Sequence, residues 1–147
     1  MWCRKYSEIV PKIESLAAIK LGVPIDEVGV TLVAHHALQD YVSESPTDEG
    51  PPFFLRIMHA GTNVTEIIGG SDFPRQAYPM PSGRRTHFLT ASSIVRIMTA
   101  LMGKEARLHA PGPEGLPGGY PVLVGPRGVN VPPIEGLSRQ AAIEINE

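Results

Sequence analysis

The stretch VGVTLVAHH, residues 28–36, has the pattern of a β-strand. Its apolar side chains follow the two-residue period of a strand: Val28, Val30, Leu32 and Ala34. Val33 makes the other face apolar for part of the length, so we expect a strand that is covered on both faces. The strand then ends in two adjacent histidines. A strand of this kind needs partner strands beside it and helices above it.

A helix is predicted just before this strand, from Glu8 to about Leu21. Ser7 can cap its N-terminus, and Gly22 is the stop residue. Pro11 falls in the expected first turn, where a missing N–H costs nothing. A buried stripe at helical spacing supports the assignment: Ile9, Ile13, Leu16, Ala17 and Leu21.

Short strands and turns are predicted after the double histidine. The polar residues 43–52 indicate a surface loop. Residues 53–59 and 64–68 are expected to be strands joined by a turn at Gly61-Thr62-Asn63. Residues 69–86 are expected to be irregular.

The rest of the chain alternates helices with short strands. Thr90 or Ser92 should cap a second helix, whose apolar side is expected to be Ile94, Val95, Ile97, Met98 and Leu101. A short strand at 107–110, a Pro/Gly loop at 111–119 and a hairpin of 122–124 with 129–131 should follow. Ser138 should cap a last helix that begins at Arg139.

The elements together predict a single domain over residues 1–147 with an α+β fold. We expect mixed, mainly antiparallel strands and hairpins packed with about three helices, in a loop-rich chain. The 15 glycines and 15 prolines, which cluster after residue 44, agree with that expectation.

Charge and composition argue against several classes of partner. The net charge of −2 and pI near 6.2 give no electrostatic footprint for nucleic acid. No apolar run approaches the roughly 18 residues of a membrane span. Cys3 is the sole cysteine, which rules out an intrachain disulfide and fits a reducing compartment. We therefore expect a cytoplasmic protein that binds neither nucleic acid nor membrane.

His35 and His36 are the first candidates for catalysis. A histidine at a strand end can act as a general base near neutral pH. Because neighbours on a strand point to opposite faces, one of the two would face a cleft while the other packs behind it. The alternative is that both are ordinary strand-end residues bonded to backbone or water.

Four basic residues are candidates for binding an anionic substrate. Lys12 lies beside the apolar stripe of the first helix, where it could bind a carboxylate or simply cover the edge of the core. Arg4 is a bidentate anion clamp in principle. Arg84 and Arg85, with His87, lie in the expected loop before the second helix and could hold an anion or be a solvated pair.

Metal and phosphate motifs are weak in this sequence. No histidine forms an i, i+4 pair with a Glu between, so a divalent metal would need His36 and a distant ligand. Residues 112–119 superficially match a phosphate cradle, but Pro113 and Pro117 remove donors and Glu114 repels anions. No G-x-G-x-x-G, Walker A or G-x-S-x-G motif occurs, so a nucleotide domain would lie outside the chain.

Three stretches resemble the C-terminal substrate domain of the lactate/malate dehydrogenase superfamily, which includes the family 4 glycosidases. The first is LGVPIDEV at 21–28, followed by the strand that ends in histidine. The second is the Gly61-Thr62-Asn63 turn after a strand. The third is YPVLVGPRGV at 120–129, with a final helix that starts at Leu137-Ser138.

The resemblance implies roles for particular residues. His36 corresponds to the catalytic acid/base histidine of that superfamily, and Lys12 falls where its dehydrogenases place a carboxylate-binding arginine. The chain would be the C-terminal substrate and oligomerisation part of a longer, homo-oligomeric protein. Its N-terminal domain, outside this chain, would bind NAD or NADP and supply the acidic partner of His36.

Three functions are therefore hypotheses. The first is the substrate-binding domain of an NAD(P)-dependent oxidoreductase that acts on a small anionic substrate and is incomplete as an enzyme alone. The second is a glycosidase-like enzyme that uses NAD and a divalent metal. The third is a non-enzymatic dimerisation or binding module.

Overall fold

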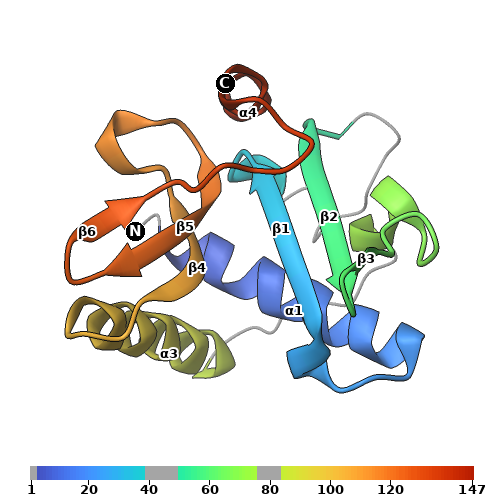
Figure 1. Cartoon of the computed structure of the whole chain (residues 1–147), viewed down its shortest axis with the longest axis horizontal. Coiled ribbons are helices and arrows are strands. Elements are labelled where there is room, and N and C mark those ends of the chain that lie inside the picture. The colour runs from blue at the N-terminus through green and yellow to red at the C-terminus, as the bar shows by residue number, and fades with distance from the viewer. Residues whose placement is uncertain (1–2, 39–49, 76–83) are drawn as a thin grey trace.

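The computed structural model describes residues 3–38, 50–75 and 84–147, and it confirms an α+β fold (Figure 1). Its described helices are α1 (Cys3–Leu21), α3 (Arg84–Leu101) and α4 (Arg139–Asn146). The strands are β1 (Val28–Ala34), β2 (Phe53–His59), β3 (Thr62–Asn63), β4 (Ala106–Pro111), β5 (Gly119–Gly125) and β6 (Gly128–Asn130). Three 3₁₀ turns are η1 (Ile25–Glu27), η2 (Gly70–Arg75) and η3 (Pro113–Gly115).

The strands form one six-stranded sheet with the order β3-β2-β1-β5-β4, and β6 pairs with β5. Every pairing is antiparallel. The predicted β5–β6 hairpin and the predicted cap of α4 are both confirmed, since Ser138 Oγ accepts from the Ala141 N–H at 3.1 Å. Local turn and cap chemistry therefore sufficed to predict these elements.

β1 is buried on both faces, as its sequence predicts. Leu32 packs on one side with Ile13 of α1 and Ile57 of β2. Val33 packs on the other side in a second core that includes Tyr120 and Val122 of β5. The molecule thus has two hydrophobic cores that meet at one strand.

The sheet is split beside β1. β1 pairs with β2 over seven residue pairs, from Val28↔His59 to Ala34↔Phe53, but it pairs with β5 only at Ala34↔Gly119. Beyond that pair β1 and β5 diverge (Figure 1). In a continued register Leu32 would face Pro121, which has no N–H to donate to a ladder. The sheet therefore opens into two halves beside the part of β5 that contains Pro121.

α1 differs from its prediction at its start. It begins at Cys3 rather than Glu8, so Pro11 lies in the helix interior and removes one i→i−4 hydrogen bond. The C-terminal end agrees with prediction, since Gly22 has a φ of +69° and Val23 N–H donates to the Ala18 carbonyl at 3.0 Å.

The predicted strand over 64–68 is wrong. β3 is confined to Thr62–Asn63, and a run of turns follows it. Asn63 Oδ1 accepts from both the N–H and the hydroxyl of Thr65, at 3.1 and 2.6 Å. Thr65 Oγ1 in turn accepts from the Ile57 N–H at 2.8 Å. These side-chain bonds replace a strand ladder with a compact turn.

α3 also corrects the sequence-based assignment. It begins at Arg84, so Arg84, Arg85 and His87 lie in a helix and not in a preceding loop. Most of its expected apolar side faces outward, whereas Ala100 is buried and Ile97 partly so. We call the exposed set the α3 outer stripe: Ile94, Val95, Met98, Leu101 and Met102, which are 39–83% exposed.

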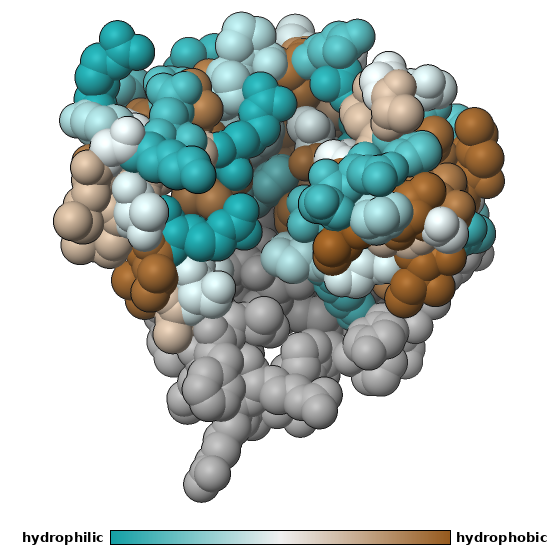
Figure 2. Space-filling model, turned by 60° about the horizontal axis from the view of Figure 1, so that its bottom comes forward, coloured by the Kyte–Doolittle hydropathy of each residue, from teal (hydrophilic) through white to brown (hydrophobic). Residues whose placement is uncertain are grey.

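Figure 2 turns the bottom of the molecule forward and shows hydrophilic residues across the middle of the described surface, with hydrophobic residues toward its margins. Among the described helices, none has the length and apolar character needed to cross a membrane.

Candidate functional site

The two histidines lie beyond β1 rather than on it, because the strand ends at Ala34. Their ring centroids are 3.8 Å apart and the rings are tilted by 48°, so the prediction that they face opposite sides is wrong. His35 Nδ1 accepts from the Ala37 N–H at 3.2 Å, and the Leu38 N–H donates to the His35 carbonyl at 3.0 Å. His35 therefore shapes the turn that follows the strand.

The predicted cations do not form one described cluster. Lys12 lies on α1 and is partly buried, and burial lowers its pKa. Arg4 lies in α1, and Arg84 and Arg85 lie in α3, but their side chains are outside the described part of the structure.

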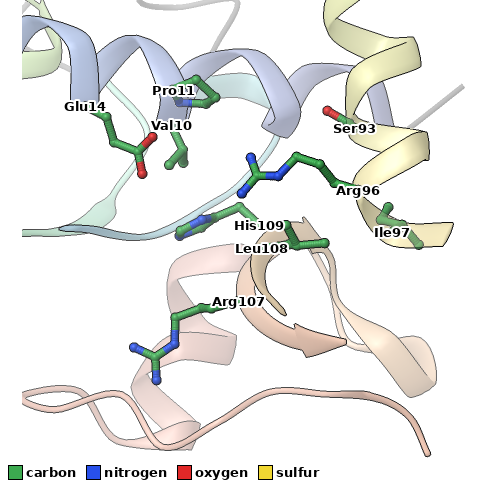
Figure 3. A pocket seen from close by; sticks show the side chains of 9 residues that line it. All are labelled: Val10, Pro11, Glu14, Ser93, Arg96, Ile97, Arg107, Leu108 and His109. Carbon is green, nitrogen blue, oxygen red and sulfur yellow. The ribbon is translucent and has the colours of Figure 1, made fainter. Parts of the chain in front are cut away.

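A different group of polar residues lines a cleft of about 60 Å³ between α1, α3 and β4 (Figure 3). We call it the α1–α3–β4 cleft. Its lining residues are Val10, Pro11 and Glu14 from α1, Ser93, Arg96 and Ile97 from α3, and Arg107, Leu108 and His109 from β4. Lys12 is two residues from Glu14, which places it roughly 160° around the helix axis, away from this cleft.

His109 occupies the point where the sheet is split. Its Nε2 accepts the Leu32 backbone N–H at 3.2 Å. This bond requires a neutral imidazole with its proton on Nδ1. Burial, together with the positive charges of Arg107 and Arg96, lowers the pKa of His109 to about 4. At neutral pH the imidazole is therefore uncharged and serves as a substitute for the missing strand partner of Leu32.

Glu14 and Arg96 enter the cleft from opposite sides, with the His109 imidazole between them (Figure 3). Burial raises the pKa of Glu14, and the positive charge of Arg96 partly offsets that rise. The guanidinium of Arg107 points away from the other polar groups in this view. Arg96 is thus the cation that the cleft offers to a ligand.

The size and charge of the cleft limit what it can hold. A volume of about 60 Å³ corresponds to roughly two water molecules, which is room for a carboxylate or phosphate group but not for a whole cofactor. A guanidinium binds either group through paired N–H donors. The carboxyl group of Glu14 can add a donor when it is protonated.

The described residues do not fit a nicotinamide dinucleotide. Such a cofactor binds where a glycine-rich turn leads from a parallel strand into a helix, and every described strand pairing is antiparallel. Among the side chains that the structure describes, no group of three from His, Cys, Asp or Glu could hold a metal ion.

Sequence reasoning missed Glu14, Arg96 and His109 as a group. Glu14 stands next to buried Ile13, and His109 stands next to buried Leu108, which was the available signal for these two. No local sequence pattern connects the three residues, because they belong to three different elements, α1, α3 and β4.

No protein-family model matches this chain, and no match was found among curated proteins. The fold and the cleft alone therefore define its class, an antiparallel α+β domain with a small, cation-bearing cleft beside a split sheet.

Proposed function

We propose that the α1–α3–β4 cleft binds the anionic group of a small molecule. The observation that carries the proposal is the position of Arg96, which reaches across a cleft of about 60 Å³ toward an uncharged His109. His109 is uncharged, so the attraction for an anion comes from Arg96, and the raised pKa of Glu14 favours the protonated carboxyl, which donates to an anion instead of repelling it. A carboxylate or phosphate group matches both the size and the charge.

We further propose that this binding serves the substrate side of an NAD(P)-dependent oxidoreductase in a reducing, cytoplasmic compartment. The resemblance to the lactate/malate dehydrogenase superfamily supports this, as does the adjacent pair of histidine rings directly after β1. The dinucleotide would be bound by a polypeptide other than the described residues, and we derive no hydride transfer from the geometry. The part assigned to this chain is to bind and orient the anionic end of the substrate.

Calorimetric titration with acetate, oxalate and inorganic phosphate tests the binding proposal. At least one anion should bind to the wild-type chain with one-to-one stoichiometry. Arg96→Gln should weaken it about 10-fold or more, because a charge-assisted contact is lost. Arg127→Gln is the matched control, since Arg127 is an exposed arginine in the β5–β6 turn. Equal weakening by the two substitutions, or no binding by the wild type, would contradict the proposal.

The oxidoreductase assignment needs a separate test in the polypeptide that carries the nucleotide-binding domain. His36→Gln should abolish turnover there and leave cofactor affinity nearly unchanged, because a proton-transfer group is removed without altering the dinucleotide site. Full turnover of this variant would contradict the oxidoreductase assignment but would not affect the anion-binding proposal.

The α3 outer stripe favours a second candidate function, a module that self-associates. Its five apolar residues recur at i, i+1, i+4, i+7 and i+8, which is the pattern of a helix that packs on another helix. Exposed apolar patches of this kind mark interfaces, and one helix face can pack on its own copy about a two-fold axis. Sedimentation should then detect a dimer that Met98→Glu dissociates, while a wild-type monomer at all concentrations would rule out this function.

A further inference from the structure

A second cavity, of about 310 Å³, lies in another part of the molecule between α4 and the β5 half of the sheet. We call it the α4 cavity. Its walls are formed mainly by apolar side chains, among them Leu116, Tyr120, Val131, Ile134, Leu137 and Ala142. It shares no lining residue with the α1–α3–β4 cleft, so it constitutes an independent candidate site.

Hydrogen bonds hold the wall formed by α4 in place. The buried Asn146 side chain accepts from the Gly119 N–H at 3.2 Å and donates to the Ala142 carbonyl at 3.0 Å. The Tyr120 hydroxyl donates to the same carbonyl at 3.3 Å. Because α4 is tied to β5 at these points, the cavity cannot close by a simple shift of the helix. It is a preformed site.

The walls select an apolar ligand. A dry cavity of about 150 Å³ accommodates benzene, so about 310 Å³ is room for roughly two fused rings or a branched aliphatic group. Pro132 and Pro133 add rigid apolar surface, and the ring of Tyr120 gives an aromatic face. A wholly polar ligand would lose its hydrogen bonds to water and would not regain enough hydrogen bonds from the walls of the cavity.

The rim of the cavity sets the charge of the ligand. Arg139 is the sole charged residue among those that line it, and its side chain belongs to the exposed start of α4. Ser138 Oγ accepts from the Ala141 N–H, so its hydroxyl proton remains available for donation. A cation and a hydroxyl donor at the rim of an apolar cavity complement a carboxylate on an apolar body.

We propose that the α4 cavity binds an aromatic or branched aliphatic monocarboxylate, with its body inside and its carboxylate at Arg139. The proposal does not depend on the function of the α1–α3–β4 cleft. It adds a second ligand site to the same chain, occupied by a larger and more apolar molecule than the first cleft can hold.

Titration with 2-naphthoate, followed by heteronuclear NMR of the amide groups and by calorimetry, tests the proposal. The wild-type chain should bind one equivalent saturably, with shifts confined to residues 116–143 of the cavity walls. Arg139→Gln should weaken binding about threefold to fivefold, as for a partly solvated ion pair. Arg127→Gln, the control, should leave affinity unchanged. Naphthalene methanol, which lacks the carboxylate, should bind the wild type and Arg139→Gln equally.

Ala142→Leu provides a second test, because the added carbons would project from a residue that lines the cavity and is 3% exposed. This variant should abolish binding while its amide spectrum remains dispersed. If it does not fold, Arg139→Gln still decides the matter, since that substitution is on the surface. No saturable binding by the wild type, equal affinity of Arg139→Gln, or loss of binding in Arg96→Gln would each overturn the proposal.

Discussion

At the scale of single residues, His109 joins the two halves of the sheet. The Leu32 N–H donates to its imidazole at a position where β1 is no longer paired with β5. A buried N–H without a partner costs about 1–3 kcal/mol, so the imidazole satisfies a donor that the split would otherwise leave unpaired. His109 therefore has a structural role in the sheet and also lines the cleft.

The titration of His109 predicts how stability depends on pH. Its folded pKa of about 4 lies below the ordinary value of 6.5, so the unfolded chain takes up a proton first as pH falls. The free energy of unfolding should therefore decrease between pH 6.5 and 4, by at most about 3 kcal/mol. Urea unfolding of the wild type and of His109→Gln across this pH range measures the decrease.

The titration of Glu14 has the opposite effect on the free energy of unfolding as pH falls, because a carboxyl group with a raised pKa binds its proton more tightly in the folded state. Both proteins in that comparison retain Glu14, so its effect cancels. His109→Gln should have a flatter stability profile between pH 6.5 and 4. Identical profiles would mean that His109 does not titrate as its buried position requires.

Asn146 is the second residue with a role that its sequence position hides. It is 1% exposed and bonds to both backbone groups of Gly119. Asn146→Ala should lower the free energy of unfolding by about 1–3 kcal/mol, because the buried Gly119 N–H loses its acceptor. Glu144→Ala, on the exposed side of the same helix, should change it by less than about 0.5 kcal/mol. Chemical denaturation distinguishes the two.

Gly118 and Asn146 should be energetically coupled. Gly118 has a φ of +70°, and a Cβ there would clash with Asn146 Oδ1. Gly118→Ala should therefore be strongly destabilising, and less so in an Asn146→Ala background, where the clash with the amide group is removed but the backbone strain and the 2.7 Å approach to the Cβ of residue 146 remain. Strictly additive free energies in a double-mutant cycle would show that the two positions do not meet as described.

At the scale of elements, α1 offers a direct test of where the helix begins. In a helix that starts at Cys3, Pro11 is internal, and Pro11→Ala should raise the free energy of unfolding by about 1–3 kcal/mol. In a helix that starts at Glu8, the same substitution would change little, because proline is tolerated in the first turn. Thermal unfolding of the wild type and the variant separates the two outcomes.

Elements with local signals were predictable from the sequence. The alternation in residues 28–34, the Gly22 stop and the Ser138 cap each lie within a few residues of the structure they specify. The turn at Asn63 was missed, because it depends on a contact that competes with local propensity. In the turn, the decisive bond joins Thr65 to Ile57 of the neighbouring strand.

At the scale of the whole molecule, the candidate site arises from the arrangement of the elements. β1 carries a hydrophobic core on each side, and the sheet opens where β5 turns away from it. α1 and α3 flank this opening with β4, and they bring together Glu14, Arg96 and His109. Residues so far apart in sequence gave no common motif, so the cleft could not be predicted. The His35-His36 pair, by contrast, is adjacent in the sequence and could be recognised there.

Anion binding in the α1–α3–β4 cleft is tested most directly by a phosphate titration followed through backbone and Arg side-chain ¹⁵N shifts. Phosphate bound in the cleft should cause saturable shifts of Arg96 Nε and of the Leu32 and Ser93 amides, with no comparable change at Arg127. Shifts that are spread evenly over the exposed basic residues, or that never saturate, would show nonspecific screening and contradict the claim.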